Sequence, residues 1–591
     1  MFEWIHTQVK RPIFFLRQHL SDRHFFIVSS ILVGAASGLA AIVLKYFVHN
    51  IELLVRYSSR NYEAFLPFAL FPLIGIFLTV LYIRFILKKD LKKGSAEIVY
   101  AILKKSSTIN PRNIYAHLVS SGLTVGFGGS MGLESPMVST GSAIGANYGV
   151  TYQLSYKDRT VLLGCGAAAG IAAAFNAPIA GVLFAIEVLL ADVTASAFIP
   201  LIVAAASGAL VSKIIMKEGI ILNFTLQQPF DYHNTFFYII LGVACGLVAL
   251  AYARIFSSIE ERFSSIKNVW WRVLIGGIVL FALVMLWPPL YGEGYESIKA
   301  LSQLQEGDLL SRSPLNSFMT TEMLILIFIG SLVFLKMIAA AVTMGSGGSG
   351  GSFAPSLFVG ACLGYFFARL VNISKLASIP ESNFTLVAMA GILSGVFYAP
   401  LTAIFLIAEL TGGYELMIPL MMVAALSLLV AHFFQPLSME GKRLANKLQG
   451  SIENRDKILL SRLDLQTLIE TNFSIVRPDD NLAGLVNVIA KSYRNIFPVV
   501  DLEGKLVGLV YLDKIRNIIF DPNQYQKTKV LDLMTNEITV VEAHENLHQA
   551  LLKFEQANHW NLPVVNNGKY MGFLSKSTIL TKYRNELIAT V

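Results

Sequence analysis

The sequence predicts an all-α membrane domain built from two related halves, followed by a smaller α+β tail. Three observations lead to this fold class: an apolar composition, repeated apolar runs of membrane-crossing length, and a pair of duplicated glycine-rich motifs. Of the 591 residues, 54% are hydrophobic and only 15% are charged. A soluble protein keeps about a quarter of its residues charged, so this composition indicates a polytopic membrane protein.

Apolar runs of near membrane-spanning length recur up to about residue 440. A helix needs about 20 such residues to cross the hydrocarbon layer. The runs are Phe25–Phe47, Leu66–Leu87, Ala197–Ile215, Phe236–Ala253, Val273–Leu290, Met323–Met344, Phe384–Leu410 and Leu416–Phe433. Many of them contain Gly, Ser or Pro, so we expect several helices to be broken or closely packed.

Charge predicts how the chain is oriented. Residues 1–24 carry scattered charges, and Phe25–Phe47 is too long for the apolar core of a cleavable signal, so we expect 1–24 to be an N-terminal cytoplasmic segment. Lysines and arginines crowd the connection 88–112, which the positive-inside tendency places in the cytoplasm. We therefore expect a plasma (inner) membrane protein with both termini cytoplasmic. The net charge of +8 reports this topology and predicts no nucleic-acid partner.

Internal repeats divide the membrane domain, 25–440, into halves at about 25–215 and 236–435. Thr124–Pro136 matches Thr343–Pro355 at an offset of 219, and Phe175–Glu187 matches Phe397–Glu409 at an offset of 222. Two matches in nearly one register indicate a duplication. After a linker at 441–471, the tail repeats a strand, a glycine turn and a second strand, with a helical pattern before each copy.

Two predicted helix starts carry the chemistry. Gly132–Pro136 and Gly351–Pro355 each place glycines before a proline suited to the first helical turn. A helix start leaves about four N–H groups unpaired and carries about half a positive charge, which suits a mobile anion. Glu134 lies at the first of these starts, and a carboxylate within a membrane usually marks a functional site. A deprotonated Glu134 would plug an anion pathway, and this gating role is the interpretation that we favour. The alternative is that Glu134 only caps the helix and has no gating role.

With these motifs the chain resembles the CLC family of chloride channels and chloride/proton exchangers, essentially end to end. Gly132–Pro136 is similar to the family's motif whose glutamate gates the pore, and Gly351–Pro355 to the motif that holds the central chloride. The resemblance implies inverted halves, one pore per subunit of a homodimer, and a C-terminal CBS pair at 472–522 and 535–587. It also implies that backbone N–H groups bind the anion, those of Leu133, Glu134, Ser135, Ser352 and Phe353.

Some positions depart from the family pattern. Lys93 stands where a chloride-coordinating serine is usual, beside Gly94 and Ser95 as further pore-lining candidates. Lys93 could bind the anion or carry protons, but we favour a side chain that snorkels into a wet vestibule. Ser438 aligns with the family's pore tyrosine, which predicts a wider constriction.

Val188 replaces the second glutamate that exchangers often carry, which favours passive conduction. The alternatives are a proton-coupled chloride/proton exchanger on the same scaffold and, from another class, a non-conducting membrane sensor that reads nucleotide. Glu187 and Glu409 are interpreted as structural groups at helix ends, and Lys336 as a snorkelling or interhelical charge.

In the tail, Asp513 is a weak candidate for binding the ribose of an adenine nucleotide, while Ser575 and Ser577 stand where Thr and Asp are more usual. A dimerising role is an equal alternative, so no cofactor is assigned. The glycine-rich loop at 345–351 satisfies the dinucleotide-binding fingerprint and the nucleophile-elbow pattern, but only because it is rich in glycine and serine, so we assign neither function to it. Ten histidines lack ligand spacing, so we expect no metal site. With a transport function expected, we expect no enzymatic activity. The expected partners are lipid, chloride and a second copy of the chain.

Overall fold

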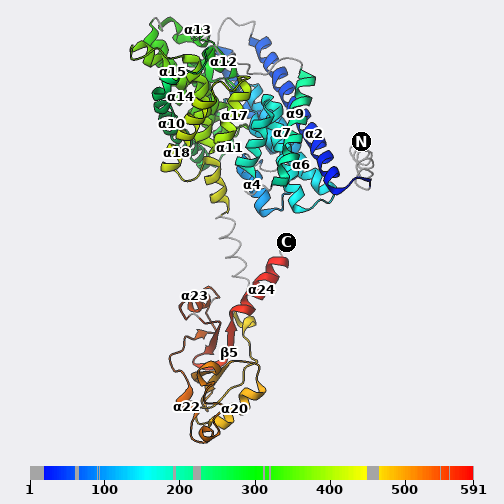
Figure 1. The fold of residues 1–591 in the computed structure, drawn as a ribbon, viewed down its shortest axis with the longest axis vertical. Helices are drawn as coiled ribbons and strands as arrows, with labels where there is room; N and C mark the ends of the chain where they lie inside the picture. Colours follow the sequence, from blue (N-terminus) through cyan, green and yellow to red (C-terminus); the bar gives the residue numbers. More distant parts are fainter. Residues whose placement is uncertain are drawn as a thin grey trace. The chain divides into compact units, whose positions relative to one another are not determined.

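The computed structural model describes residues 19–59, 66–88, 91, 94–190, 195–216, 228–310, 313–318, 321–448, 465–545, 547–557 and 559–589. The chain forms two compact units, Met1–Ala445 and Asn446–Val591 (Figure 1). The first unit is helical and ends close to the composition change near residue 440. Lys93 and its neighbour Lys92 lie outside the described residues.

The first half of the helical unit begins with a long helix, α2, and ends with α9. Its helices are α2 (Asp22–Ser59), α3 (Leu66–Leu81) with a π-helical turn η1 (Tyr82–Leu87), α4 (Ser95–Lys104), α5 (Asn113–Gly126), α6 (Glu134–Thr151), α7 (Tyr156–Phe175), α8 (Pro178–Phe184) with the turn η2 (Ala185–Leu189), and α9 (Ala195–Met216).

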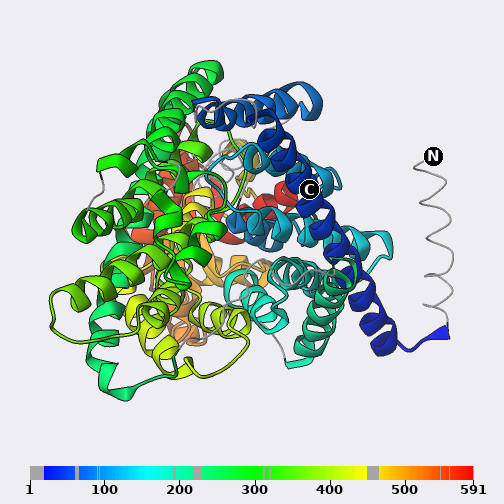
Figure 2. The same ribbon diagram turned by 90° about the horizontal axis from the view of Figure 1, so that it is seen from above.

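The second half repeats this order after a short turn, η3 (Tyr232–Asn234). Its helices are α10 (Thr235–Ser265), α11 (Val269–Leu286), η4 (Pro288–Leu290), α12 (Tyr295–Ser302), α13 (Gly307–Leu310), η5 (Pro314–Phe318), α14 (Glu322–Gly345), α15 (Phe353–Ile373), α16 (Glu381–Phe397), α17 (Pro400–Leu410) and α18 (Met417–Phe434), followed by a helical segment at 439–448. Seen from above, the blue-to-cyan helices of the first half lie beside the green-to-yellow helices of the second (Figure 2).

The two halves share local structure and packing. Asn176 and Tyr398 end α7 and α16 in the same left-handed conformation, with φ of 54° and 58°. The following helices, α8 and α17, both begin at a proline, whose fixed φ suits a first helical turn. In the same way α6 packs on α7 and α15 on α16, while α2 packs on α9 and α10 on α18. The duplication read from the sequence is therefore a duplication of tertiary structure.

Glycine lets the paired helices approach closely. A Cβ placed on Gly141 of α6 would lie 2.1 Å from the carbonyl oxygen of Gly166 in α7, and one on Gly166 would lie 1.9 Å from the oxygen of Gly141. Side chains at these positions would separate the two helices. Small residues at helix contacts are typical of membrane proteins, where backbone packing replaces the hydrophobic effect.

Within the described ranges, nine helices are long and apolar enough to cross a membrane. They include Tyr156–Phe175 and Phe353–Ile373, which the apolar runs did not single out because glycine, alanine and serine lower their hydropathy. The predicted run Phe384–Leu410 is split into α16 and α17, which turn at Tyr398. Broken and short helices, expected from the Gly and Pro content, are thus present.

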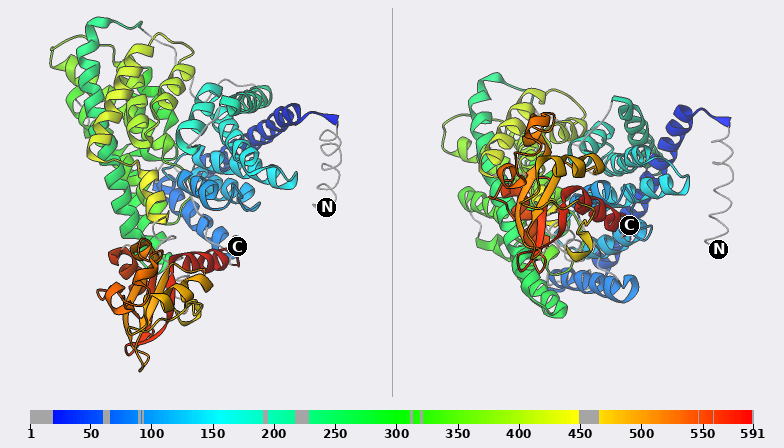
Figure 3. Two further views of the ribbon diagram at one scale, coloured as in Figure 1. Left: turned by 60° about the horizontal axis from the view of Figure 1, so that its bottom comes forward. Right: turned by 90° about the horizontal axis from the view of Figure 1, so that it is seen from below.

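The second unit contains two small sheets surrounded by short helices, coloured orange to red in Figure 3. Strands β1 (Ile496–Val500) and β2 (Leu506–Tyr511) pair antiparallel; β3 (Val541–Glu542) runs parallel to β4 (Asn561–Asn566), which pairs antiparallel with β5 (Lys569–Ser575). The helices are η6 (Leu465–Leu468), α20 (Leu482–Lys491), α21 (Leu512–Ile515), η7 (Pro522–Gln524), α22 (Val530–Leu533), α23 (Leu547–Ala557) and α24 (Lys576–Ala589). Both β-hairpins carry a register shift at the same point, after Val499 and after Val564, so this unit is also a duplication.

Candidate functional site

The loops before α6 and α15 meet in the middle of the helical unit. Gly132 and Gly351 exchange two backbone hydrogen bonds, from the Gly132 N–H to the Gly351 oxygen at 2.9 Å and from the Gly351 N–H to the Gly132 oxygen at 2.8 Å. This short antiparallel bridge joins the two duplicated motifs. It places the N-termini of α6 and α15 side by side, each with its first N–H groups free of intrahelical partners.

A small cavity lies at these two helix starts, which we call the central cavity. It measures about 20 Å³, enough for a water-sized ligand. The described residues that line it include Gly94, Ser95, Glu134, Ser135, Ser352, Phe353, Glu440 and Arg443. The cavity therefore brings together predicted site residues from both halves of the chain.

The carboxylate of Glu134 fills the space between the two helix starts. Glu134 is 3% exposed, and its Oε1 accepts a short hydrogen bond from the hydroxyl of Tyr295. Its Oε2 is buried and has no hydrogen-bond partner among the described residues. A Cβ placed on Gly132 would lie 2.1 Å from this Oε2 and 3.1 Å from the backbone nitrogen of Ala354. Glu134 thus reaches from α6 to the start of α15, where an anion would bind.

Phe353 gives the second helix start an apolar wall. Its ring lies 5.6 Å from the ring of Phe175, 6.3 Å from that of Phe184 and 5.5 Å from that of Phe397. Phe175 and Phe397 occupy equivalent positions in the two halves. Such a cluster excludes water, which strengthens electrostatic interactions between backbone N–H groups and an anion.

Glu293 is a site residue that the sequence analysis missed. It lies in the loop between α11 and α12, outside the membrane-spanning helices, and its Oε1 accepts a hydrogen bond of 3.1 Å from the Leu133 N–H. Burial, and then the negative charge of Glu134, raise the pKa of Glu293 well above its usual range. The Glu293 carboxyl group therefore occupies the Leu133 N–H, which the sequence analysis expected to bind the anion.

The loop that carries Glu293 is held by Lys336 of α14. The buried Lys336 Nζ donates to the carbonyl oxygens of Gly292 at 2.8 Å and of Leu290 at 3.4 Å, and it lies 4.9 Å from the centre of the Phe358 ring. Lys336 is 0% exposed, so it is an interhelical charge and does not snorkel. The pattern Gly-Glu-Gly after an apolar helix, with positive φ at both glycines, is the signal that could have pointed to this loop.

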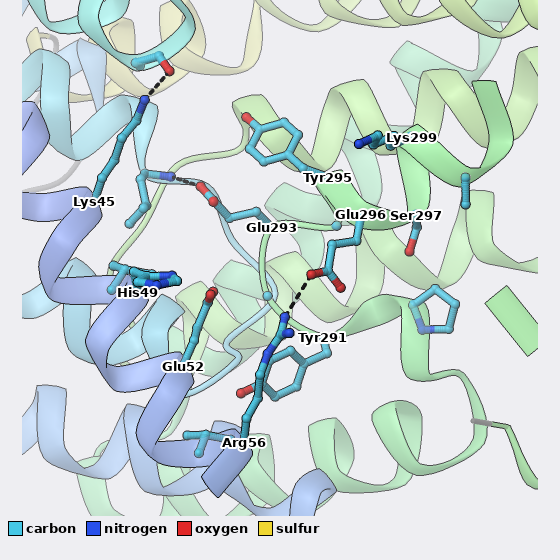
Figure 4. A pocket seen from close by; sticks show the side chains of 18 of the residues that line it. Lys45, His49, Glu52, Arg56, Tyr291, Glu293, Tyr295, Glu296, Ser297 and Lys299 are labelled. Carbon is cyan, nitrogen blue, oxygen red and sulfur yellow. Dashed lines mark hydrogen bonds and ion pairs between the residues drawn. The ribbon is translucent and has the colours of Figure 1, made fainter. Parts of the chain in front are cut away.

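A wide vestibule of about 1180 Å³ lies on the α12 side of Glu134. One face of α2 lines it with Lys45, His49, Glu52 and Arg56; Arg56 reaches Glu296 of α12, whereas Lys45 extends toward the end of α7 (Figure 4). Arg56 forms an exposed ion pair of 2.8 Å with Glu296. The Lys45 Nζ donates to the Ala174 oxygen at 2.6 Å, at the C-terminal end of α7. Charges of both signs thus surround the approach to Glu134.

The other end of the central cavity is formed by α4 and the segment 439–448. Gly94 and Ser95 line the cavity as predicted candidates. Ser438 does not appear among the described lining residues; its Oγ accepts from the Gly441 N–H at 3.1 Å and caps the helix at 439–448. Glu440 and Arg443, from the first turns of that helix, line the cavity in its place.

Glu187 and Glu409 cap helices of opposite halves. The Glu187 carboxylate accepts from the N–H groups of Leu401 and Thr402 at 3.0 and 2.8 Å, at the start of α17. The Glu409 carboxylate accepts from the N–H groups of Ile179 and Ala180 at 3.1 and 2.9 Å, at the start of α8. Each carboxylate satisfies N-terminal donors that would otherwise be unpaired. Val188 follows in the half-buried turn η2.

In the second unit, the candidate nucleotide residue Asp513 is engaged at the surface. It pairs with Arg516 at 2.6 Å, and its side chain is 75% exposed. Ser575 and Ser577 share a hydrogen bond of 2.7 Å between their hydroxyl groups. Asp513 is thus held by a surface ion pair, and the structure adds no further contact that points to a nucleotide.

Comparison with known proteins identifies both units. Residues 74–432 match the family model described as voltage gated chloride channel, and residues 465–521 and 530–585 match the CBS domain. A ClcB-like chloride channel protein of Ralstonia nicotianae is 27% identical over 444 residues, which are 72% of this chain and 97% of that protein. The chloride channel protein CLC-f of Arabidopsis thaliana is 26% identical over 546 residues, covering 79% of this chain and 68% of that protein.

Solved structures share the fold. A slow cyanobacterial Cl⁻/H⁺ antiporter superimposes with a TM-score of 0.62 at 21% identity, over 73% of this chain and 99% of the other. A CLC-type fluoride/proton antiporter superimposes with a TM-score of 0.57 at 23% identity, over 70% of this chain and 96% of the other. A eukaryotic CLC transporter superimposes with a TM-score of 0.58 at 18% identity, over 96% of this chain and 98% of the other. The predicted fold class, a helical membrane domain of two repeats followed by a CBS pair, is confirmed.

Proposed function

The chain belongs to the voltage gated chloride channel family, and from this premise we propose that it conducts chloride passively through the central cavity, with Glu134 as the gate. It is an integral membrane protein of the CLC anion-transport type, with a C-terminal CBS pair. The observation that carries the proposal is the Glu134 carboxylate lying between the bridged starts of α6 and α15.

The proposed mechanism follows from what these helix starts offer. Their backbone N–H groups attract an anion without a fixed full charge, so the anion can also leave. Ionised Glu134 competes for the same space and excludes the anion. Protonated, it no longer competes, and chloride passes between Leu133–Ser135 on one side and Ser352–Phe353 on the other.

Passive conduction is favoured by Val188, which carries no group able to relay a proton at the position after Glu187. The second candidate is proton-coupled exchange. It is favoured by the two similar solved structures described as a Cl⁻/H⁺ and a fluoride/proton antiporter. Both functions use the same anion pathway, so they differ only in whether proton movement is obligatory.

Purified full-length protein in chloride-loaded vesicles separates the two candidates. We expect chloride efflux whose reversal potential does not change when a proton gradient is imposed. A reversal potential that moves with the pH gradient, together with proton uptake during efflux, would establish exchange. Absence of anion flux at every pH and voltage would refute both. Empty vesicles are the control.

We further propose that the protein is a homodimer of the plasma membrane, with both termini in the cytoplasm. The family relationship supports the dimer. The basic connection 88–112 supports the orientation. Single-molecule counting in native lipid discs tests the first point, and protease access to tagged termini in sealed vesicles tests the second.

A further inference from the structure

The start of α4 is a third helix N-terminus at the central cavity, and a carboxylate already occupies it. The Ala96 N–H donates to Glu440 Oε2 at 3.0 Å, and the Ser95 hydroxyl donates to the same oxygen at 3.3 Å. Gly94 precedes them with φ of 91°, and a Cβ there would lie 2.7 Å from that oxygen. Glycine therefore opens the space in which the carboxylate sits.

Glu440 and Glu134 face the same cavity from opposite ends. Both line the central cavity of about 20 Å³. Glu134 Oε2 is buried at one end of the cavity and makes no hydrogen bond of good geometry with the described residues. At the other end, Glu440 takes the backbone donor of α4. Its carboxylate stands in for an anion that would bind the same Ala96 N–H and Ser95 hydroxyl.

Arg443 offers Glu440 a second partner one turn away. Its guanidinium donates to Glu440 Oε1 at 2.5 Å and also pairs with Glu260 of α10. The guanidinium lies 5.5 Å from the centre of the Phe256 ring, which fixes it at the cavity wall. Because Arg443 is tethered on two sides, it stays in place if Glu440 leaves α4. The carboxylate can then turn fully onto Arg443 and free the α4 donors.

We propose that Glu440 is a second gate of the anion pathway, whose carboxylate closes the α4 end by occupying the Ala96 N–H and opens it by moving onto Arg443. This inference rests on the proposed function, because it assumes that anions cross the central cavity. It assigns to Glu440 a role that no glycine-rich motif predicts. The competing interpretation is an ion pair that only anchors the helix at 439–448 to α10.

The test measures chloride efflux from vesicles that contain full-length wild-type protein, E440Q, E134Q or E134Q/E440Q. Glutamine keeps the size and an accepting oxygen but removes the charge. We expect E440Q to raise efflux about fivefold, the factor for losing about 1 kcal/mol of net hydrogen bonding. The double variant should exceed E134Q by a similar factor, since each gate closes a different end.

E260Q is the matched control. Glu260 pairs with the same arginine but does not line the central cavity. We expect E260Q to leave efflux within about twofold of wild type, the size of a surface ion-pair effect. Equal increases in E260Q and E440Q would overturn the gate and leave only the anchoring ion pair. Unchanged efflux in E440Q and in the double variant, with intact folding, would overturn it as well.

Two further results keep the outcomes separate. If E440Q does not fold, S95A provides a second test, because it removes the hydroxyl that holds the Glu440 carboxylate on α4 without disturbing Arg443. We expect S95A to raise efflux by about twofold. No increase in S95A would then overturn the proposal that Glu440 is a gate. If E134Q raises efflux and E440Q does not, only this inference fails. If neither wild type nor E134Q carries anions, the proposed function fails and the second gate falls with it.

Discussion

The starts of α6 and α15 use one loop design twice, but they differ in the residue at the first helical position. In the first half this residue is Glu134, whose carboxylate reaches across to the other helix. In the second half it is Phe353, whose ring packs among Phe175, Phe184 and Phe397. A duplicated frame can therefore supply two similar sets of backbone donors while only one of them carries a switchable charge. The duplication repeats the backbone frame, and the side chain at this one position breaks the repeat.

The largest expected effect comes from removing the charge that distinguishes the two starts. E134Q should raise chloride efflux at neutral pH about tenfold, the factor for removing about 1.4 kcal/mol of competition at the two helix starts. It should also abolish the larger part of the pH dependence. Efflux from vesicles between about pH 5 and pH 9 measures both. E296Q is the control, because Glu296 lies in the vestibule with an 85% exposed side chain. A wild-type pH profile in E134Q would contradict the gating role.

The next effect tests the bridge that joins the two starts. A Cβ on Gly351 would lie 2.5 Å from Ser135 Cβ and 3.1 Å from its nitrogen, whereas one on Gly132 first meets the movable Glu134 carboxylate. We expect G351A to cost about 1–3 kcal/mol of stability, as overpacking does, and to reduce efflux per folded protein. G132A should displace Glu134, and it should be somewhat less destabilising because its closest rigid contact, Ala354 Cβ at 2.8 Å, is longer than the 2.5 Å contact at Gly351. Thermal unfolding followed by fluorescence-detected gel filtration compares the pair; equal stability would show that the two loops tolerate crowding alike.

A smaller effect is expected at the hydroxyl that holds the gate closed. Tyr295 donates to Glu134, so Y295F should favour the open position by about 1 kcal/mol and raise efflux about fivefold. Tyr291 provides a close control, since it lies in the loop just before α12, which begins at Tyr295, and its buried hydroxyl has no hydrogen-bond partner among the described residues. Y291F should therefore behave like wild type. Equal efflux in both variants would remove Tyr295 from the gate.

The smallest effect at neutral pH is expected at Glu293. Because the pKa of Glu293 is raised by burial and then by Glu134, this carboxyl group keeps its proton to a higher pH than an ordinary glutamate. Below that pKa it is neutral, and glutamine resembles it closely. Above it, the ionised group repels entering anions, so efflux falls as the pH rises. The pH dependence that remains in E134Q should therefore disappear in E134Q/E293Q, and its persistence would assign it to another group.

What the sequence could predict depended on how local each feature is. Glu134 and Phe353 lie within a few residues of the glycines and prolines that define their helix starts, so the motifs alone located them. Glu293 and Glu440 reach the same site from 160 and 344 positions away from their backbone partners, Leu133 and Ala96. No spacing rule connects residues so distant. Ser438 aligned with a pore tyrosine, but a serine just before a helix is a common N-cap, and that local role describes its contacts.

The fold was predictable where the pattern was strong. Duplicated motifs and apolar runs indicated two helical halves and a separate tail. The runs were less informative for α6, α7 and α15, because close backbone packing at Gly141 and Gly166 requires small residues that lower hydropathy. The same property that lets these helices cross tightly makes them inconspicuous in the sequence.

The exchange of caps between Glu187 and Glu409 makes the two halves depend on each other. Glu187, in the turn after α8, completes the start of α17, and Glu409, in the last turn of α17, completes the start of α8. Each carboxylate therefore satisfies donors that belong to the other half. The helix starts of one half are fully paired only when the other half is in place.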